Sequence, residues 1–381
     1  MRKYIPRKLN LLKVLKNKSY FLFGPRQTGK TFLINNTLKG YRYYNLLKTD
    51  VYLKLNQAPH RLREEITQDD QIVIIDEIQK LPILLDEIQH LIENRGIHFL
   101  LTGSSARKLR RKGINLLGGR ARTRRLFPFI YKELNNEFDL LKALNIGLVP
   151  NIYFSDEPYE DLAAYFGTYL KEEIAAEAIV RNVPAFSRFL SVAGLCNGQL
   201  INYSNISSDA AVPRATVQEY FQILRDTLLG DDLPAWKKSI KRKPIMTSKF
   251  YLFDIGVARF LQNRRGLKAR SPEFGEAFEA YIFHELKSYC EYSGGADLCY
   301  WRSTSGFEVD FILNNTTAIE VKSKSNVSGK DLKALRMLQE EKELKNYIVV
   351  SMEETTRKVD NIFILPWKEF LERLWRGALT T

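Results

Sequence analysis

Short apolar runs alternate with amphipathic stretches along the first hundred residues of the chain. Four runs rich in apolar or aromatic side chains have the length of a β-strand, at residues 20–23, 41–46, 72–75 and 97–102. At residues 83–94 the apolar side chains instead recur at spacings of three and four, which is typical of one face of a helix. Strands that alternate with helices in this way indicate a parallel α/β sheet.

The pattern changes in the rest of the chain. Residues 165–179, 186–196 and 214–224 have helical periodicity and lie in the middle of the chain. Towards the C-terminus, residues 307–313 and 318–322 alternate apolar and polar side chains, as half-buried strands do. We therefore expect an α/β N-terminal part, a mainly helical middle part and an α/β C-terminal part.

The first predicted strand leads into a loop with the spacing of a phosphate-binding site. Residues 24–31 read G-x-x-x-x-G-K-T and precede a predicted helix. Glycines let backbone N–H groups approach phosphate oxygens, and the helix N-terminus adds its positive dipole end. Lys30 is expected to contact the β- and γ-phosphates of ATP, and Thr31 to bind Mg²⁺. The predicted ATP-binding residues of this loop are Gly24, Pro25, Arg26, Gln27, Thr28, Gly29, Lys30 and Thr31.

Polar side chains follow two of the buried strands. Asp76 and Glu77 end the run at 72–75, and we expect Asp76 to hold Mg²⁺ through water and Glu77 to polarise the attacking water. Without a phosphate-binding loop, a solvated acidic turn would be the better interpretation. Ser104 and Ser105 follow the run at 97–102, where a hydroxyl can contact the γ-phosphate, although Ser105 fits a helix N-cap equally well.

A basic block covers residues 107–112 and 118–125. An arginine in this block can neutralise phosphate charge as an arginine finger, in the same chain or from a neighbouring subunit. Arg120 is our candidate for that catalytic role, whereas ordinary solvation explains most of the block.

These motifs resemble those of the bacterial and archaeal AAA-superfamily ATPases that carry an uncharacterised C-terminal region. The resemblance rests on the loop at 24–31, on Asp-Glu-Ile-Gln at 76–79, on residues 101–105, and on Gly-Gly-Arg-Ala before Leu-Phe-Pro-Phe at 118–129. It covers most of the chain and implies ATP binding and hydrolysis. The chain departs from the family pattern at Leu47, where family members tend to carry an acidic residue.

Residues 204–224 have the pattern of a helix-turn-helix whose second helix covers 214–224. The segment after it, residues 228–243, is expected to form a wing. Its basic side chains are Lys237, Lys238, Lys241, Arg242 and Lys243. Contact with a DNA backbone and a structural connector with a solvated basic hairpin are equally good interpretations of this wing.

The C-terminal strands carry a further constellation. Asp310, followed by Glu320-Val-Lys322 and preceded by Glu279 on a predicted helix, resembles the core of PD-(D/E)XK nucleases. The resemblance implies that Asp310 and Glu320 hold Mg²⁺, that Glu279 completes the metal shell, and that Lys322 orients water or stabilises the phosphate. Two alternatives stay open, namely a nuclease fold without cleavage activity and a structural Lys322 ion pair without a metal.

Composition narrows the class of protein. The chain has 381 residues, 45% of them hydrophobic, and a net charge of +14, so sizeable cores and a polyanionic partner are both plausible. Cys196, Cys290 and Cys299 show no paired spacing, which indicates reduced thiols, no zinc site and a cytoplasmic location. No signal peptide and no run long enough to span a membrane is present.

We therefore expect three domains: a P-loop parallel-sheet ATPase at 1–150, a helical and winged-helix domain at 151–245, and an α/β restriction-nuclease-like domain at 246–381. The favoured function is an ATPase whose nucleotide state controls DNA binding or cleavage, with a homo-oligomer as an open alternative. A non-catalytic ATP-dependent switch or antitoxin-like regulator is the second interpretation. A plain P-loop kinase is disfavoured by the basic block and the C-terminal half.

Overall fold

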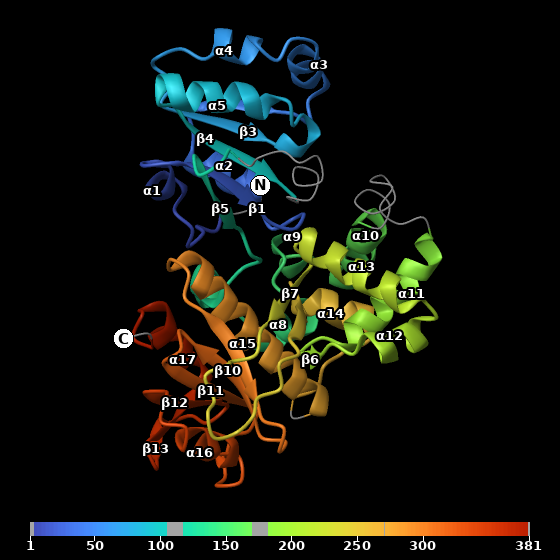
Figure 1. Cartoon of the computed structure of the whole chain (residues 1–381), viewed down its shortest axis with the longest axis vertical. Coiled ribbons are helices and arrows are strands. Elements are labelled where there is room, and N and C mark those ends of the chain that lie inside the picture. The colour runs from blue at the N-terminus through green and yellow to red at the C-terminus, as the bar shows by residue number, and fades with distance from the viewer. Residues whose placement is uncertain (1–3, 105–116, 170–181, 270, 380–381) are drawn as a thin grey trace. The chain divides into compact units, whose positions relative to one another are not determined.

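The computed structural model describes residues 4–104, 117–169, 182–269 and 271–379 (Figure 1). The chain divides into two compact units. The first comprises Met1–Phe129 with Asp226–Leu229, and the second comprises Ile130–Arg225 with Gly230–Thr381. Residues 130–150, assigned above to the first domain, thus belong to the second unit, which also spans the expected boundary at residue 245.

A five-stranded parallel sheet forms the centre of the first unit and confirms the predicted α/β fold. Its strand order is β2-β3-β4-β1-β5. The strands are β1 (Ser19–Phe23), β2 (Arg42–Asn45), β3 (Ile72–Asp76), β4 (His98–Gly103) and β5 (Ala121–Arg125). The helical elements are α1 (Leu11–Leu15), α2 (Lys30–Thr37), α3 (Thr49–Gln57), α4 (Arg61–Glu65), η1 (Ile78–Lys80) and α5 (Leu84–Arg95).

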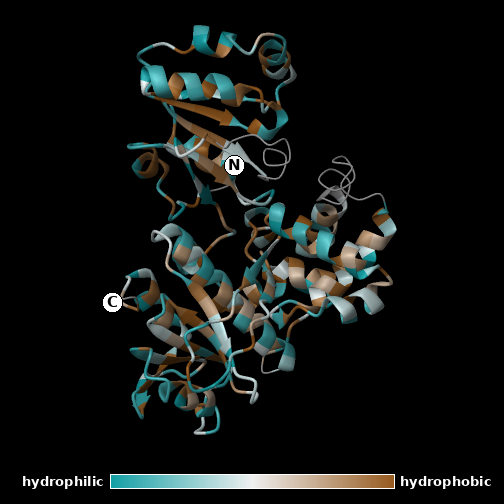
Figure 2. Cartoon of the chain, in the orientation of Figure 1, coloured by the Kyte–Doolittle hydropathy of each residue, from teal (hydrophilic) through white to brown (hydrophobic). Residues whose placement is uncertain are grey.

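The core of the first unit lies between one face of this sheet and α5. Alternate strand residues, among them Phe21, Ile75 and Phe99, are fully buried against the apolar stripe of α5 that includes Ile88 and Leu91. Strands β3 and β4 are hydrophobic along their length in Figure 2, as expected for parallel strands covered on both faces. This core fixes the C-terminal edge of the sheet, where the phosphate-binding loop begins.

Strand β5 was not predicted, because its sequence Ala-Arg-Thr-Arg-Arg has no apolar run. It pairs in parallel with β1, from Ser19 opposite Ala121 to Phe23 opposite Arg125. An edge strand needs few apolar side chains, and its charges discourage pairing with another chain. The basic block that we interpreted as solvated surface is therefore partly a structural strand. Residues 107–112 of that block, and the candidate Ser105 before it, lie outside the described residues.

The second unit begins as a mainly helical region. Its helical elements are α7 (Tyr131–Leu134), η2 (Asn135–Glu137), α8 (Leu140–Ile146), α9 (Pro150–Tyr153), α10 (Pro158–Tyr169), α11 (Val183–Leu195), α12 (Tyr203–Ala210), α13 (Arg214–Asp226) and α14 (Ile255–Leu261). The end of the helix expected at 165–179 falls outside the described residues. Three short strands, β6 (Gln199–Leu200), β7 (Gly230–Leu233) and β8 (Lys249–Leu252), form an antiparallel sheet in the order β6-β8-β7.

A six-stranded mixed sheet forms the rest of the second unit, in the order β13-β14-β12-β11-β10-β9. Strands β9 (Leu298–Arg302), β10 (Glu308–Leu313) and β11 (Thr317–Lys322) are antiparallel, whereas β11, β12 (Asn346–Ser351) and β14 (Ile362–Pro366) are parallel. The short β13 (Arg357–Val359) closes one edge. The helices are α15 (Pro272–Tyr292), α16 (Lys333–Gln339) and α17 (Trp367–Trp375).

Residues 234–248, which join β7 to β8, run along the free edge of β9, and we call them the strap. The Trp236 N–H donates to the Tyr300 carbonyl at 2.7 Å, and the Ile245 N–H donates to the Arg302 carbonyl at 2.8 Å. These bonds satisfy backbone groups that an edge strand would otherwise leave unpaired. The strap therefore joins the small antiparallel sheet to the large mixed one.

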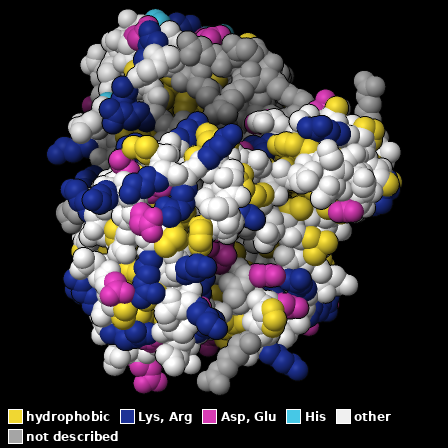
Figure 3. Space-filling model, turned by 60° about the horizontal axis from the view of Figure 1, so that its bottom comes forward, with side chains coloured by type: hydrophobic (Ala, Val, Ile, Leu, Met, Phe, Trp, Pro, Cys, Tyr) yellow, Lys and Arg dark blue, Asp and Glu magenta, His cyan; other side chains and the backbone are white. Residues whose placement is uncertain are grey.

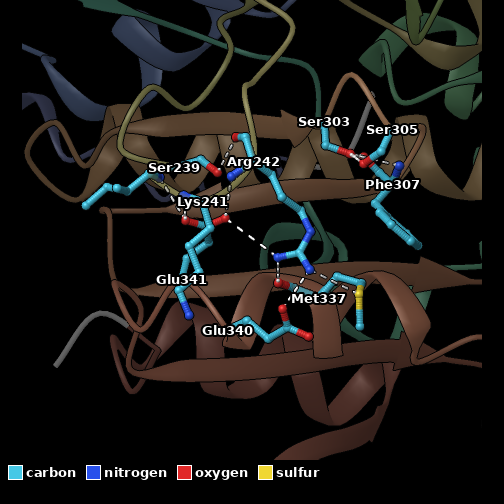
Figure 4. A network of polar contacts seen from close by, with 10 residues as sticks. Ser239, Lys241, Arg242, Ser303, Ser305, Phe307, Met337, Glu340 and Glu341 are labelled. Atoms are coloured by element: carbon cyan, nitrogen blue, oxygen red, sulfur yellow. Dashed lines mark hydrogen bonds and ion pairs between the residues drawn. The ribbon is translucent and has the colours of Figure 1, made fainter.

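The turn of the strap is bound by the residues that follow α16 (Figure 4). The Glu341 carboxylate accepts the N–H groups of Ile240, Lys241 and Arg242 at 2.8, 2.8 and 3.1 Å. The Arg242 guanidinium donates to the Glu340 carboxylate at 2.6 Å. Arg242 is therefore bound within the second unit and is not solvated, contrary to the expectation of a solvated basic hairpin. The other four basic side chains, Lys237, Lys238, Lys241 and Lys243, are exposed.

A buried carboxylate holds α14 against the turn that follows α8. Asp254 caps the N-terminus of α14 and accepts the Leu148 N–H at 2.7 Å. Burial raises the pKa of Asp254 to about 6, even though several backbone N–H groups oppose the shift. Gly147 lies directly beside it with a φ of +80°, and a Cβ at this position would come within 1.9 Å of Asp254 Oδ1.

We predict that Gly147→Ala lowers the free energy of unfolding of the second unit by about 3 kcal/mol, because the new methyl group meets both steric overlap and an unfavourable φ. Chemical denaturation of the full chain, followed by tryptophan fluorescence, measures the loss. The matched control is Gly266→Ala, at φ +65° with nothing within 4 Å, which should cost only about 1 kcal/mol. Equal losses in the two variants would contradict the proposed packing of Gly147 against Asp254.

Candidate nucleotide-binding site

The phosphate-binding loop connects β1 to α2 and has a backbone that suits close approach to an anion. Gly29 adopts a φ of +93° and Gln27 a φ of +61°, so the chain curls between the strand and the helix. A Cβ on Gly24 would come within 2.5 Å of the Leu126 carbonyl oxygen, which explains a glycine there. The Thr28 hydroxyl donates to the Pro25 carbonyl at 2.9 Å and closes the loop from within.

The Lys30 side chain folds back over this loop. Its Nζ donates to the carbonyl oxygens of Gly24 and Pro25 at 2.7 and 3.1 Å, and the residue is 7% exposed. A buried ammonium group held on two neutral carbonyls gains less than one held on phosphate oxygens, because charge-assisted contacts are stronger. The Lys30 ammonium group therefore lies at the phosphate-binding loop itself.

The Asp76 carboxylate lies at the end of β3 and collects hydroxyl groups from three other elements. Oδ2 accepts the Thr31 hydroxyl at 3.1 Å and the Tyr43 hydroxyl at 2.7 Å, and Oδ1 accepts the Thr102 hydroxyl. Thr31 and Asp76 offer the hard oxygen donors that Mg²⁺ prefers. Burial and the Asp76 charge together raise the pKa of Tyr43, so its hydroxyl stays protonated and can donate.

Glu77 follows Asp76 in a left-handed backbone conformation, with a φ of +63°. Such a conformation is uncommon for a residue with a side chain, and it turns Glu77 out of the strand direction. Burial raises the pKa of Glu77, while the positive charges of Lys30 and Arg26 oppose that shift. The carboxylate accepts the Gln79 side-chain amide, which also lies 3.5 Å from the Ser104 hydroxyl.

The structure thus brings Lys30, Thr31, Asp76 and Glu77 to one edge of the sheet, with Ser104 linked to Glu77 through Gln79. Sequence analysis missed Tyr43, Gln79 and Thr102. The register could have indicated two of them, because β2 and β4 flank β3 and polar side chains near the C-terminal ends of parallel strands meet at one edge. Gln79 ends the Asp-Glu-Ile-Gln motif but was given no role, because its contact with Glu77 depends on the short η1 helix.

Arg120 does not approach this edge within its own chain. It precedes β5, whose first residue Ala121 pairs with Ser19 at the start of β1, whereas the phosphate-binding loop follows the end of β1. The Arg120 guanidinium forms an ion pair with Glu93 of α5. Arg120 therefore lies away from the phosphate-binding loop, and its role as an arginine finger stays a prediction. Arg125 pairs with Phe23 in the register and lies nearer the loop.

A second group of predicted residues lies in the second unit. Asp310 Oδ2 accepts the Val321 N–H at 2.7 Å, and Lys322 Nζ lies 2.5 Å from Glu320 Oε1. Burial raises the pKa of Asp310, and the charges of Glu320 and Glu279 raise it further. Burial also raises the pKa of Glu320, which Lys322 opposes. The structure therefore places Glu279, Asp310, Glu320 and Lys322 within electrostatic reach of one another.

This carboxylate cluster includes a lysine that sequence analysis did not single out. Lys249, the first residue of β8, is 4% exposed, and its Nζ lies 3.2 Å from Glu279 Oε1 and 2.6 Å from Glu308 Oε1. The Tyr251 hydroxyl donates to Glu279 at 2.7 Å. Among the described residues, no three His, Cys, Asp or Glu side chains are arranged to hold a metal ion.

Comparison with known proteins assigns a class to the first unit. Residues 16–135 match a family model described as an AAA domain. Residues 137–268 and 274–370 match two models described as domains of unknown function (DUF8612 and DUF4143). The N-terminal part of the chain is accordingly an AAA-type P-loop domain. Within the ranges that the structure describes, no helix is both long and apolar enough to cross a membrane.

Two curated relatives come from Methanocaldococcus jannaschii. Uncharacterized protein MJ1637 is 23% identical, over 93% of this chain and 85% of its own length. Uncharacterized protein MJ1544 is 22% identical, over 84% of this chain and 78% of its own length. Both matches therefore extend well beyond the AAA domain.

One solved structure with detectable similarity is a Signal Transduction ATPase with Numerous Domains (STAND) protein with a tetratricopeptide repeat sensor, PH0952 from Pyrococcus horikoshii. It is 14% identical with a TM-score of 0.26, and the match covers 76% of this chain. The match spans about half of that protein, 47% of its chain. A similarity at this level does not define a common fold.

We predict that Glu77→Gln keeps nucleotide affinity but lowers ATP turnover by about 10² to 10⁴, because the amide preserves shape and loses the charge that orients water. Binding of a fluorescent ATP analogue and release of inorganic phosphate measure the two quantities. Gln89→Glu, on the exposed part of α5, is a control for surface charge near this unit. Turnover at the wild-type rate in Glu77→Gln would reduce Glu77 to an acidic turn residue.

Proposed function

We propose that this protein binds and hydrolyses ATP, and that ATP occupancy controls a DNA-binding second unit. The observation that carries the proposal is the convergence at one loop of the Lys30 ammonium, the Thr31 hydroxyl and the Asp76 and Glu77 carboxylates. Their types and positions match the parts that phosphoryl transfer needs, namely a phosphate-bound cation, oxygen ligands and a group that orients water.

The residues at the loop also fit Mg²⁺. The Thr31 hydroxyl and the Asp76 carboxylate lie 3.1 Å apart, and each offers oxygen to a hard cation. Bound Mg²⁺ would offset the charge of the phosphate oxygens. Tyr43 and Thr102 hold the carboxylate in place by donating to it, so that its orientation is fixed before nucleotide arrives.

Glu77 is the residue that acts on water in this proposal. Its buried position raises its pKa and thereby its strength as a base, while the charge of Lys30 opposes that shift. The Gln79 amide orients the Glu77 carboxylate by donating to it, and the same amide lies 3.5 Å from the Ser104 hydroxyl. A γ-phosphate that contacts Ser104 would disturb the Ser104–Gln79 contact and thereby the orientation of the Glu77 carboxylate. Nucleotide binding would in this way be linked to the group that orients water.

The element order of the second unit supports two finer assignments. The order α11-β6-α12-α13-β7-β8, with strand order β6-β8-β7, resembles that of a winged helix-turn-helix and supports that assignment. The sequence α15-β9-β10-β11-α16-β12, with Asp310 and Glu320 on adjacent strands, is similar to the PD-(D/E)XK core. We therefore propose a winged helix joined by the strap to a nuclease-like domain.

The first test concerns the loop. Lys30→Ala should abolish measurable ATP binding in a folded protein, because it removes the ammonium group expected to contact the β- and γ-phosphates. Isothermal titration calorimetry of the full chain with ATP and Mg²⁺ gives the affinity, and circular dichroism checks the fold. Lys39→Ala, on the turn after α2, is the matched control for loss of charge. Unchanged affinity in Lys30→Ala would exclude the loop as the ATP site.

The alternative of a non-catalytic switch is decided by the same measurements. A wild-type protein that binds ATP through Lys30 and shows no turnover above Glu77→Gln would be such a switch. The proposal of ATP hydrolysis would then fail, while the assignment of the nucleotide site would stand.

We propose DNA binding by the strap because of its positive charge. Four exposed strap lysines are held on a fixed backbone, and the chain carries a net charge of +14. In the view of Figure 3, the Lys and Arg side chains are spread over the surface and do not form a single stripe. Contacts to phosphates, without reading of bases, are therefore the expected mode of binding.

We predict that neutralising Lys237, Lys238, Lys241 and Lys243 weakens duplex binding and flattens the slope of log K against log salt by about 0.9 for each lost phosphate contact. Fluorescence anisotropy over a salt series gives affinity and slope. Arg242→Gln is the matched control, because Arg242 contacts Glu340 and should not contribute to the slope. A quadruple variant with wild-type affinity and slope would remove the strap from the DNA interface.

A further inference from the structure

Lys249 occupies an unusual position for a lysine. Its side chain is 5% exposed, and its backbone is fixed in the three-stranded sheet, where Lys249 pairs with Leu200 on one side and Leu233 on the other. Burial alone would lower the pKa of Lys249, but the charges of Glu279, Asp310 and Glu308 raise it. The ammonium group therefore stays charged inside a cluster of carboxylates.

The charges around Lys249 do not balance without it. The cluster contains four carboxylates, from Glu279, Glu308, Asp310 and Glu320. Besides Lys249, its cations are the half-buried Lys322, 2.5 Å from Glu320, and Arg302, whose guanidinium lies 3.3 Å from Glu308. Glu320 Oε2 is buried without a hydrogen-bond partner among the described residues. Buried carboxylates that lack a positive partner are costly. The cluster therefore requires a further cation, and Lys249 provides that charge.

A divalent metal is the usual cation for carboxylates on adjacent strands, but the present arrangement does not fit one. No three acidic or other metal-binding side chains of the described residues are suitably arranged, and Glu279 already accepts Lys249 and the Tyr251 hydroxyl. A metal placed at Asp310 and Glu320 would also face the repulsion of two ammonium groups, from Lys249 and Lys322.

We propose that Lys249 is an internal counter-ion that takes the place of a divalent metal and excludes it from the carboxylate cluster. The strap ends directly at Lys249, and its contacts with Glu341 and β9 fix the point at which β8 begins. The small antiparallel sheet thus positions the Lys249 side chain next to Glu279 of α15 and Glu308 of β10. The nuclease-like domain is a metal-free fold as long as Lys249 stays in place.

The test compares Mn²⁺ binding by the full chain without nucleotide, using isothermal titration calorimetry. In the wild type we expect no Asp310-dependent Mn²⁺ binding tighter than about 1 mM. Lys249→Met keeps the length of the side chain and removes its charge, so Mn²⁺ should bind at least about tenfold more tightly. Adding Asp310→Asn to Lys249→Met should abolish the new site, and Lys249→Arg, which keeps the charge, should behave as wild type.

Two results would overturn the proposal. The first is Asp310-dependent Mn²⁺ binding already present in the wild type at micromolar metal, and the second is a folded Lys249→Met variant whose isotherm equals that of the wild type. If Lys249→Met does not fold, refolding with and without Mn²⁺ decides, because a metal that replaces the lost charge should restore the folded protein. Absence of rescue would contradict the proposal.

The inference does not rest on ATP hydrolysis. All titrations omit nucleotide, and weak metal binding at Thr31 and Asp76 would be the same in every variant. An inactive AAA domain would therefore leave the comparison unchanged, so the failure of one proposal can be told from the failure of the other.

Discussion

The nucleotide site depends on one buried carboxylate. Asp76 is 1% exposed and sits at the end of β3, where it accepts hydroxyl groups from α2, β2 and β4. A buried charge that lacks such donors would be expelled or neutralised, so the three hydroxyls are a condition for keeping it there. Through them Asp76 fixes the start of the P-loop helix relative to the sheet, and Glu77, Gln79 and Lys30 take their positions around that fixed point.

Carboxylates in the second unit also need partners, but there the partners are ammonium groups instead of hydroxyl groups. There the half-buried Glu279 and Glu308 form ion pairs with Lys249, and the buried Glu320 forms one with Lys322. A hydroxyl donates one hydrogen bond and leaves the carboxylate charge available to a metal, whereas an ammonium group cancels that charge. In the first unit the Asp76 charge is thus met by hydroxyl groups, whereas ammonium groups lie beside the carboxylates of the second unit.

The sequence was sufficient for parts of the structure whose signals are local. The loop at 24–31 and the apolar runs around it predicted β1, α2, β3 and β4, because burial on both faces requires continuous apolar strands. Features that depend on distant partners were missed. Strand β5 is polar because it lies at an edge, and the position of Lys249 depends on its contacts with Glu279 of α15 and Glu308 of β10. Arg120 was a candidate by charge alone, and its ion pair with Glu93 depends on the sheet register.

The most direct test of the account is a crystal structure of the full chain with Mg²⁺ and a non-hydrolysable ATP analogue. The account predicts that Lys30 Nζ leaves the carbonyl oxygens of Gly24 and Pro25, where it now lies at 2.7 and 3.1 Å, and contacts the phosphates. It also predicts Mg²⁺ beside Thr31 and Asp76. A nucleotide bound elsewhere, or one bound at the loop while Lys30 stays on the two carbonyls, would contradict it.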